Sequence, residues 1–187
     1  PPGSAFAAEP PAQTPSPPQL GDADRLFDQG VAARKAGKLA EAETFFLQAW
    51  AIKKTWDIAA NLGLVEFKLV KLAEGAEHVS YAIANLPPTE SDATRESLTK
   101  ALAQARPDIG ELTIQCDVDG AELRVGGKLK GALPLATSLF SAPGQLTIEV
   151  SKEGYAPASK TIDVQKGSAQ KVSFTLVKDA PPASSNL

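Results

Sequence analysis

The sequence predicts an α+β protein in two segregated domains: an N-terminal array of helical hairpins and a C-terminal small antiparallel β-sandwich. Two observations predict it. Small residues recur at an interval of 33 residues between Ala23 and Pro87, which is typical of a stacked helical repeat. At Glu111 the apolar residues change from helical spacing to alternation with polar residues, which is typical of strands.

The helical half is predicted to be a helical hairpin that is repeated once. Three positions recur after 33 residues: Gly30 as Gly63, Ala42 as Gly75, and Ala49 as Ala82. Apolar residues at helical spacing, separated by caps and breakers, predict five helices. They are expected between Asp22 and Gly37, Leu39 and Ile52, Thr55 and Phe67, Leu72 and Ile83, and Ser91 and Pro107. The fifth has one apolar stripe, as a helix that closes the end of a repeat array needs.

These recurring residues resemble the tetratricopeptide (TPR) repeat. Its small, aromatic and proline positions are occupied in the first copy by Gly30, Ala42, Phe46 and Ala49, and in the second by Gly63, Gly75, Val79, Ala82 and Pro87. The sequence departs from the pattern at Lys54, where the first copy lacks the proline, and at Val70, where the second lacks the glycine between its helices. The resemblance implies stacked hairpins that dock a protein or peptide on their inner face.

From Glu111 onward, apolar and polar residues alternate in short segments separated by Gly and Pro turns. The segments are Leu112–Val118, Ala121–Val125, Leu146–Val150, Ile162–Val164 and Val172–Leu176. Short strands at regular spacing with one apolar face predict a small antiparallel β-sandwich.

This half resembles the PEGA domain of bacterial surface and envelope proteins. The matching pieces are Val118-Asp119-Gly120-Ala121, Val125-Gly126-Gly127, Gly131-Ala132-Leu133-Pro134-Leu135, Pro143-Gly144 and Gly154-Tyr155. The resemblance covers about residues 110–177, and Val118-Asp119 replaces the Pro-Glu pair of the name-giving motif. The family has no catalytic residues to carry over, so the resemblance implies a module for binding or spacing.

Composition argues against several classes of function. With 19 basic and 22 acidic residues, the net charge is −3, and no basic excess predicts a nucleic-acid surface. One Cys rules out an internal disulfide, and one His makes a His-rich metal site unexpected. No run of 18 or more apolar residues predicts a membrane span.

No pattern of residues predicts catalysis. Cys116 lies on the apolar side of its strand and is expected to be a buried, inert thiol. His78 is expected to be solvated on its helix. Gly126-Gly127-Lys128 lacks the spacing of a phosphate-binding loop. We therefore expect no enzyme, no catalytic residue, no metal and no cofactor.

The inner face of the helical array is the candidate docking site. Carried over from the TPR pattern, its partner-binding residues are Phe27, Val31, Arg34, Lys35, Leu64, Phe67 and Lys68. Lys35 and Lys68 occupy the same repeat position, and together they would hold a carboxylate of a peptide. An equally weighted alternative is that Phe27 and Phe67 are partly core and that both lysines are plain solvated charges.

The chain divides into four expected segments. Residues 1–20 read as a disordered Pro-rich linker or the remnant of a signal peptide, 21–106 as the helical domain, 107–178 as the sandwich, and 179–187 as a disordered tail. Ala5-Phe6-Ala7-Ala8 has small residues at the spacing that a signal peptidase reads. A chance match in an Ala/Pro-rich spacer is the equal alternative. The first interpretation implies export to the periplasm or cell envelope.

Three functions follow from these patterns. The first is a non-enzymatic scaffold of the bacterial cell envelope, which docks a protein or peptide on the helical array. The second is a cell-wall or carbohydrate-binding module that acts through the sandwich. Against it, the sandwich has only Phe140, Tyr155 and Phe174 as aromatic residues. The third is a subunit of a larger envelope assembly, which sequence does not separate from the first.

Overall fold

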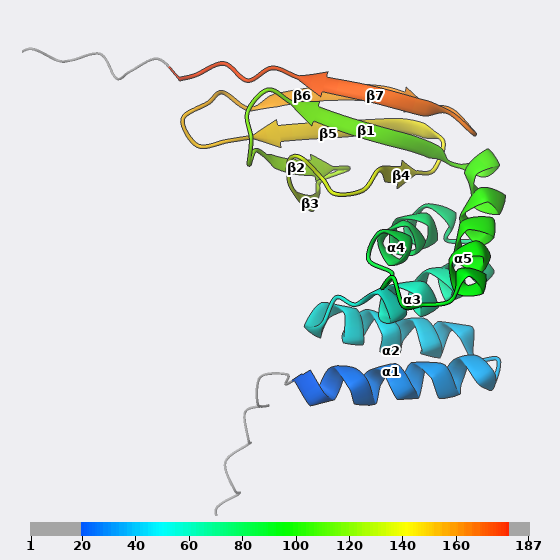
Figure 1. Cartoon of the computed structure of the whole chain (residues 1–187). Helices are drawn as coiled ribbons and strands as arrows, with labels where there is room; N and C mark the ends of the chain where they lie inside the picture. Colours follow the sequence, from blue (N-terminus) through cyan, green and yellow to red (C-terminus); the bar gives the residue numbers. More distant parts are fainter. Residues whose placement is uncertain (1–19, 180–187) are drawn as a thin grey trace, which may run out of the picture.

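The computed structural model describes residues 20–179, in which five α-helices precede seven strands (Figure 1). The helices are α1 Leu20–Lys35, α2 Leu39–Ile52, α3 Trp56–Lys68, α4 Leu72–Ala84 and α5 Asp92–Ala105. A short 3-10 helix, η1 Arg106–Asp108, leads into the strands. Almost all of the predicted N-terminal linker lies outside the described residues, and α1 already includes Leu20.

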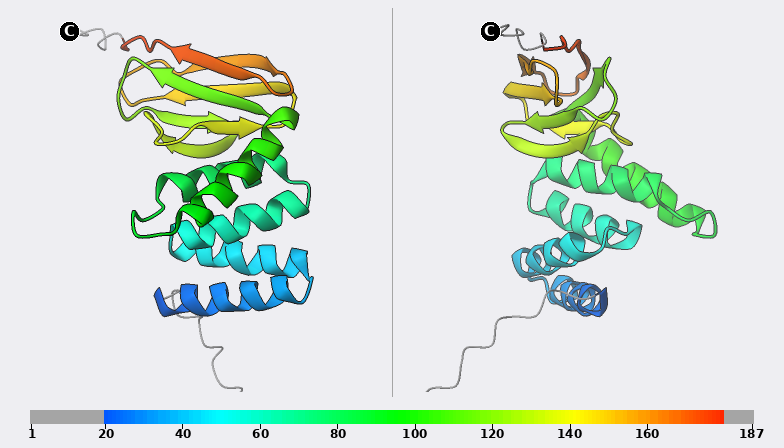
Figure 2. Two further views of the ribbon diagram at one scale, coloured as in Figure 1. Left: turned by 45° about the vertical axis from the view of Figure 1, so that its right-hand side comes forward. Right: turned by 90° about the vertical axis from the view of Figure 1, so that its left-hand side faces the viewer.

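The helices form two antiparallel hairpins, α1/α2 and α3/α4, which stack below the sheets together with α5 (Figure 2). The recurring small residues let the helices of each hairpin approach closely. A Cβ at Gly30 would lie 2.5 Å from the Phe46 ring, and a Cβ at Gly63 would lie 2.7 Å from a methyl of Val79. The two contacts are equivalent, because Gly63 lies one 33-residue repeat after Gly30 and Val79 lies one repeat after Phe46. This arrangement is consistent with a helical repeat array.

The turn between the two helices is also the same in both copies. Gly37 and Val70 both have a left-handed backbone, with φ of 76° and 62°. The backbone N–H of the following residue closes each turn. The Lys38 N–H donates to the Ala33 carbonyl at 3.0 Å, and the Lys71 N–H donates to the Glu66 backbone carbonyl at 2.9 Å. Val70 is therefore a β-branched residue at a position where glycine has no steric cost.

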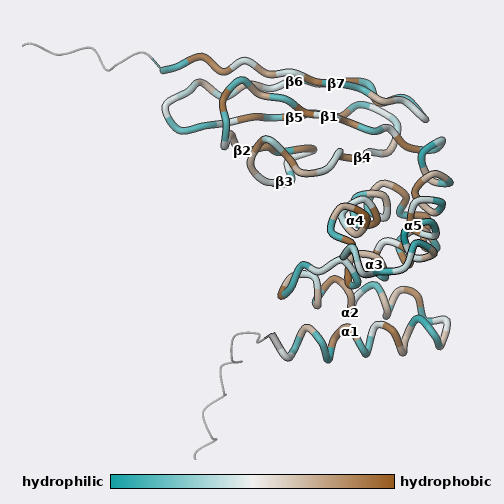
Figure 3. Tube along the Cα trace, in the orientation of Figure 1, coloured by the Kyte–Doolittle hydropathy of each residue, from teal (hydrophilic) through white to brown (hydrophobic). Residues whose placement is uncertain are grey.

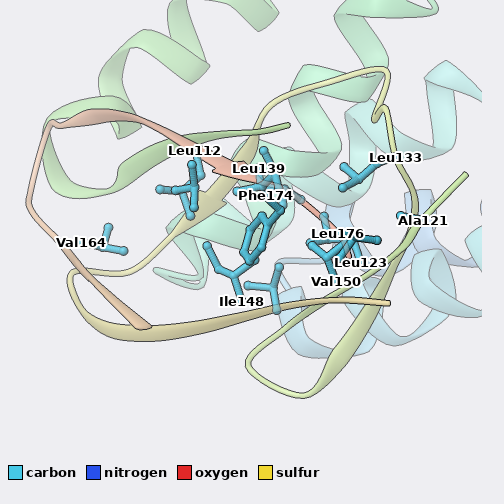
Figure 4. Close-up of a cluster of buried hydrophobic side chains, with 13 residues drawn as sticks. Leu112, Ala121, Leu123, Leu133, Leu139, Ile148, Val150, Val164, Phe174 and Leu176 are labelled. Atoms are coloured by element: carbon cyan, nitrogen blue, oxygen red, sulfur yellow. The ribbon is translucent and has the colours of Figure 1, made fainter. Parts of the chain in front are cut away.

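The seven strands form two sheets, with the hydrophobic core of the sandwich between them (Figure 4). The strands are β1 Gly110–Cys116, β2 Glu122–Val125, β3 Lys128–Ala132, β4 Leu139–Ser141, β5 Gly144–Ser151, β6 Ala158–Val164 and β7 Ala169–Phe174. One sheet has the order β4-β1-β7 and the other β3-β2-β5-β6. Hydrophobic and hydrophilic residues alternate along these strands (Figure 3). The predicted α+β fold class is confirmed.

Some details of the sandwich differ from the expectation. β1 and β7 run parallel, whereas the other strand pairs are antiparallel. The alternation did not predict β3 or β4, because β3 is largely exposed and β4 has three residues. The ordered chain also continues past β7: Tyr155 bridges Lys178, and the Asp179 N–H donates to Gly154.

The sandwich packs directly on the helices. Phe140 of β4 and Ile109, just before β1, are buried in the same apolar cluster as Ala76 and Val79 of α4. Beside this contact, the Lys130 ammonium of β3 donates to the Glu77 carboxylate of α4 at 2.7 Å. The apolar surface of the helical array therefore continues into the sandwich.

We predict that Val70→Gly stabilises the protein. The glycine relieves the left-handed strain at Val70, whose side chain is 77% exposed and loses little packing. We expect a gain of about 1 kcal/mol in the free energy of unfolding, measured by denaturant titration. The reciprocal variant Gly37→Val should lose stability at the matching turn. A loss of stability in Val70→Gly would contradict the argument.

We predict that Phe140→Ala weakens the helical array although Phe140 belongs to the sandwich. Truncating a buried Phe costs roughly 3–5 kcal/mol, and the exposed Leu129→Ala serves as the matched control in β3. The measurement is thermal unfolding followed by circular dichroism at the helical band. Our sequence-based division into two folding units at residues 106/107 predicts instead that the helical transition stays unchanged in both variants.

Candidate functional site

A groove of about 350 Å³ lies between α3, the start of α4 and α5. Its lining is mostly apolar and consists of Leu64, Phe67, Lys68, Leu72, Ala101, Gln104, Ala105 and Asp108. Its α3 wall carries three of the residues that were predicted to line the inner face, namely Leu64, Phe67 and Lys68.

Two helices supply the walls of the groove with the same spacing. On α3, Leu64 is followed by Phe67 and Lys68, and on α5, Ala101 is followed by Gln104 and Ala105. Residues three and four apart lie on one face of a helix. Each helix therefore presents one stripe to the groove, with Leu64, Phe67 and Lys68 on α3 and two alanines and Gln104 on α5.

Phe67 serves both the core and the groove. Its ring covers Gly75, at which a Cβ would lie 2.5 Å away. Phe67 is half-buried and also packs against the apolar cluster of α3, α4 and α5. Both interpretations therefore apply to Phe67: it is partly core, as the alternative stated, and it also forms part of the groove wall.

The rim of the groove carries one basic and one acidic side chain. Lys68 is exposed and makes no ion pair within the described part of the chain. Asp108 is engaged by the Lys166 ammonium at 3.1 Å. The charge that remains available to a ligand at this rim is thus the positive one of Lys68.

The four predicted site residues of the first copy do not line this groove. Phe27 is half-buried, with its ring centroid 5.7 Å from that of Phe46, and Val31 packs on the same cluster. Arg34 is half-buried, and its Nε has no hydrogen-bond partner in residues 20–179. Lys35 is exposed. The structure therefore brings three of the seven predicted residues together, namely Leu64, Phe67 and Lys68.

The groove also contains residues that the sequence did not nominate. The sequence analysis treated the helix that carries Ala101, Gln104 and Ala105 only as one with a single apolar stripe that closes the end of the array. In the structure Leu98 and Leu102 are buried, whereas Ala101 is half-buried and faces the groove. The apolar stripe of α5 is thus wider than the part that is buried, and this extra width was the sequence signal that α5 forms the second wall of the groove.

His78 is not solvated as expected. It is half-buried, and its Nδ1 lies 2.6 Å from Oε2 of Glu66, whose side chain is 3% exposed. Burial raises the pKa of the Glu66 carboxyl, and the hydrogen bond and charge of His78 oppose that rise. The hydrogen bond joins α3 to α4 inside the second hairpin.

A second carboxylate of the helical array is also paired. Glu43 of α2 accepts from the Lys71 ammonium at 2.7 Å, just before α4. This hydrogen bond raises the pKa of Lys71. Glu66 thus ties α3 to α4, and Glu43 ties α2 to the residue before α4.

Cys116 is less buried than predicted. The thiol is free and only half-buried, and it packs against the edge of the sandwich core. Within residues 20–179 no three His, Cys, Asp or Glu side chains gather as a set that could hold a metal ion.

The comparison with known families covers the β-sandwich. Residues 109–180 match the PEGA domain. No curated protein matches the chain. The match confirms the resemblance over the predicted range, whereas the TPR resemblance of the helices remains an expectation.

The PEGA domain contains the glycine turns on which the resemblance rested. Gly126 and Gly127 have φ of 56° and 76° and form the two-residue turn between β2 and β3, where two positive φ angles suit a tight hairpin. PEGA domains occur in extracellular or periplasmic proteins. In the described part of the chain, no helix has the length and apolar character required to cross a bilayer.

We predict that Glu66→Gln becomes more stable relative to the natural protein as pH rises. A raised pKa means that folding favours the protonated carboxyl. This contribution is fully present below the pKa of the unfolded state and is lost as pH rises through the folded-state pKa. The amide keeps a hydrogen bond to His78 without a buried charge. Denaturant titrations at several pH values check the trend; the opposite trend would mean that the ion pair outweighs burial.

Proposed function

We propose that this protein is a non-enzymatic scaffold, which docks a peptide segment of a partner protein in the groove between α3 and α5. The PEGA domain is then a binding or spacing module fixed to that array. The place of action that we propose is the periplasm or the cell envelope. This location rests on where PEGA domains occur and on the signal-peptidase spacing of Ala5-Phe6-Ala7-Ala8.

The observation that carries the proposal is the composition of the groove. Apolar side chains with a few convergent polar groups are the usual lining of a ligand site. Here Leu64, Phe67 and Leu72 offer apolar contact and Gln104 offers an amide. Lys68 offers a charge that has no ion-pair partner in the described part of the chain. This set suits a short segment that has an apolar anchor next to an acidic residue or a carboxyl terminus.

The role of the array as a scaffold fits its buried charges. The two buried carboxylates of the helices, Glu43 and Glu66, are held by Lys71 and His78. Burial raises the pKa of a structural carboxyl as it does that of a catalytic one, so the raised pKa of Glu66 does not by itself indicate catalysis. We infer that these pairs hold the helices in position.

The runner-up, a carbohydrate-binding sandwich, finds less support. Phe140 is buried against the helices, and Phe174 is buried in the sandwich core beneath Lys160. Tyr155 is half-buried against that core. A sugar platform needs an exposed aromatic face, and the three aromatic side chains of the sandwich are used for packing.

The test selects ligands from a random displayed peptide library on the immobilised full-length chain. Selected peptides are synthesised, and their affinities are measured for two matched variants of α5. Ala101→Trp fills the groove, whereas Ala103→Trp places the same side chain on the exposed face of the same helix. We expect Ala101→Trp to weaken binding at least about tenfold and Ala103→Trp to leave it unchanged.

Charge is tested with Lys68→Ala and the sandwich variant Lys160→Ala. Loss of Lys68 should reduce the salt dependence of association, because a rim charge acts mainly on the encounter. If the selected peptides bind Ala101→Trp and Ala103→Trp equally well, the groove is not the docking site and the proposal fails.

A further inference from the structure

The strand β1 has an edge that its neighbour covers only in part (Figure 1). The antiparallel partner β4 pairs with Gly110, Glu111 and Leu112 and then ends. β1 continues to Cys116, and on its other side β7 accompanies it along this whole length. Among residues 20–179, the second half of β1 therefore has one paired edge and one edge without a neighbouring strand.

The hydrogen bonds of β1 show which backbone groups point to the free edge. Glu111 N–H donates to Ser168, and Asp117 N–H donates to Phe174, both on the β7 side. Because the direction alternates along a strand, Ile114 and Cys116 point their N–H and C=O groups the other way. No hydrogen bond to these groups occurs among the described residues. Two donors and two acceptors thus alternate along an unpaired edge.

A slot runs along this edge. A cavity of about 340 Å³ is lined by Thr113, Ile114, Gln115, Cys116, Asp119, Leu133, Pro134 and Leu135. A second cavity of about 230 Å³ shares Thr113, Ile114 and Leu135 with it and continues to Ser138. Its two sides are therefore β1 and the segment 133–138, which connects β3 to β4.

The far wall of the slot is anchored away from β1. Leu133 N–H donates to Ala121, and Leu133 C=O accepts from Gly120, each at 2.8 Å. Leu133 is thereby held by the chain that leads into the other sheet. Since this wall has its own partners, it does not supply the missing hydrogen bonds of Ile114 and Cys116.

The chemistry of the slot selects its ligand. Alternating N–H and C=O groups at strand spacing are matched by an extended peptide backbone. The half-buried Leu135 gives an apolar surface for side chains on the inner side, next to the buried Leu133. At the Cys116 end the Asp119 carboxylate is exposed, and it makes no ion pair within residues 20–179. A basic residue complements that end.

We propose that the free edge of β1 in the PEGA domain binds an extended peptide segment of a partner protein by strand addition. The added strand runs antiparallel to β1 and in line with β4, so its amino-terminal end, with a basic residue, lies near Asp119. Three residues, about 10 Å of strand, lie opposite Ile114, Gln115 and Cys116. This site is separate from the α3/α5 groove and stands independently of the function proposed for it.

The first measurement uses amide hydrogen exchange of the free full-length chain. The backbone N–H groups of Thr113 and Gln115 point toward β7, whereas those of Ile114 and Cys116 point into the slot. We expect the amides of Ile114 and Cys116 to exchange at least about tenfold faster than those of Thr113 and Gln115, the effect of one net hydrogen bond. Equally slow exchange at all four amides would show that the edge is already covered and would overturn the proposal.

The second measurement uses the acetylated, amidated peptide Lys-Val-Thr-Val-Thr and two methylated twins. In an antiparallel pair, the peptide residues opposite Ile114 and Cys116 turn their backbone groups toward β1 and their side chains inward. The two valines of the peptide occupy these positions. N-methylation of both valines should weaken binding at least about tenfold, whereas N-methylation of the threonine between them should have little effect. Binding is read from amide shifts of β1 and from protection of the Cys116 thiol against alkylation.

Each result decides the proposal. A dissociation constant of about 1 mM or tighter, discrimination between the twins, and weaker binding to Asp119→Asn support it. No binding at that concentration, or an equal effect of both methylations, overturns it. So do amides of Ile114 and Cys116 that already exchange slowly in the free protein. In that case, slow exchange that depends on protein concentration would assign the edge to a second copy, and slow exchange in the monomer to a segment of the chain itself.

Discussion

The structure depends most on the packing of the sandwich against α4. Phe140 and Ile109 complete an apolar cluster that α3, α4 and α5 begin, and the half-buried pair of Lys130 with Glu77 fixes the orientation at its side. An isolated helical array would expose this cluster, and burying such apolar area is the dominant favourable contribution to folding. The two parts, though segregated in sequence, therefore share one core at their junction.

The candidate groove depends on this junction through α5. That helix is joined to β1 by only the short turn of η1, so the sandwich constrains the end of α5 that carries Gln104 and Ala105. Its buried side, with Leu98 and Leu102, packs on the shared cluster. The distance between α3 and α5, and with it the width of the groove, follows from where the sandwich holds α5. We infer that the PEGA domain shapes the site that it does not line.

The periodic pattern of the sequence predicted the helices, most of the strands and the close contacts of the repeat. It did not predict the contacts between segments that are distant in the chain. The 33-residue interval identified the close contacts of Gly30 and Gly63, because only small residues allow them. Alternation located most strands but carries no information on their direction, so the parallel pairing of β1 with β7 was not foreseen. Phe140 was recognised only as an aromatic residue of the sandwich. That it is buried against α4 depends on a contact between distant segments, as does the pairing of His78 with Glu66.

The central claim is that the helical array and the PEGA domain form one rigid unit. Backbone ¹⁵N relaxation of the full-length chain tests it most directly, because it gives the rotational correlation time of each part separately. Our account predicts one shared correlation time for the amides of α1–α5 and of β1–β7. Distinctly shorter and different times for the two parts would show that they tumble independently, and this result would contradict the account.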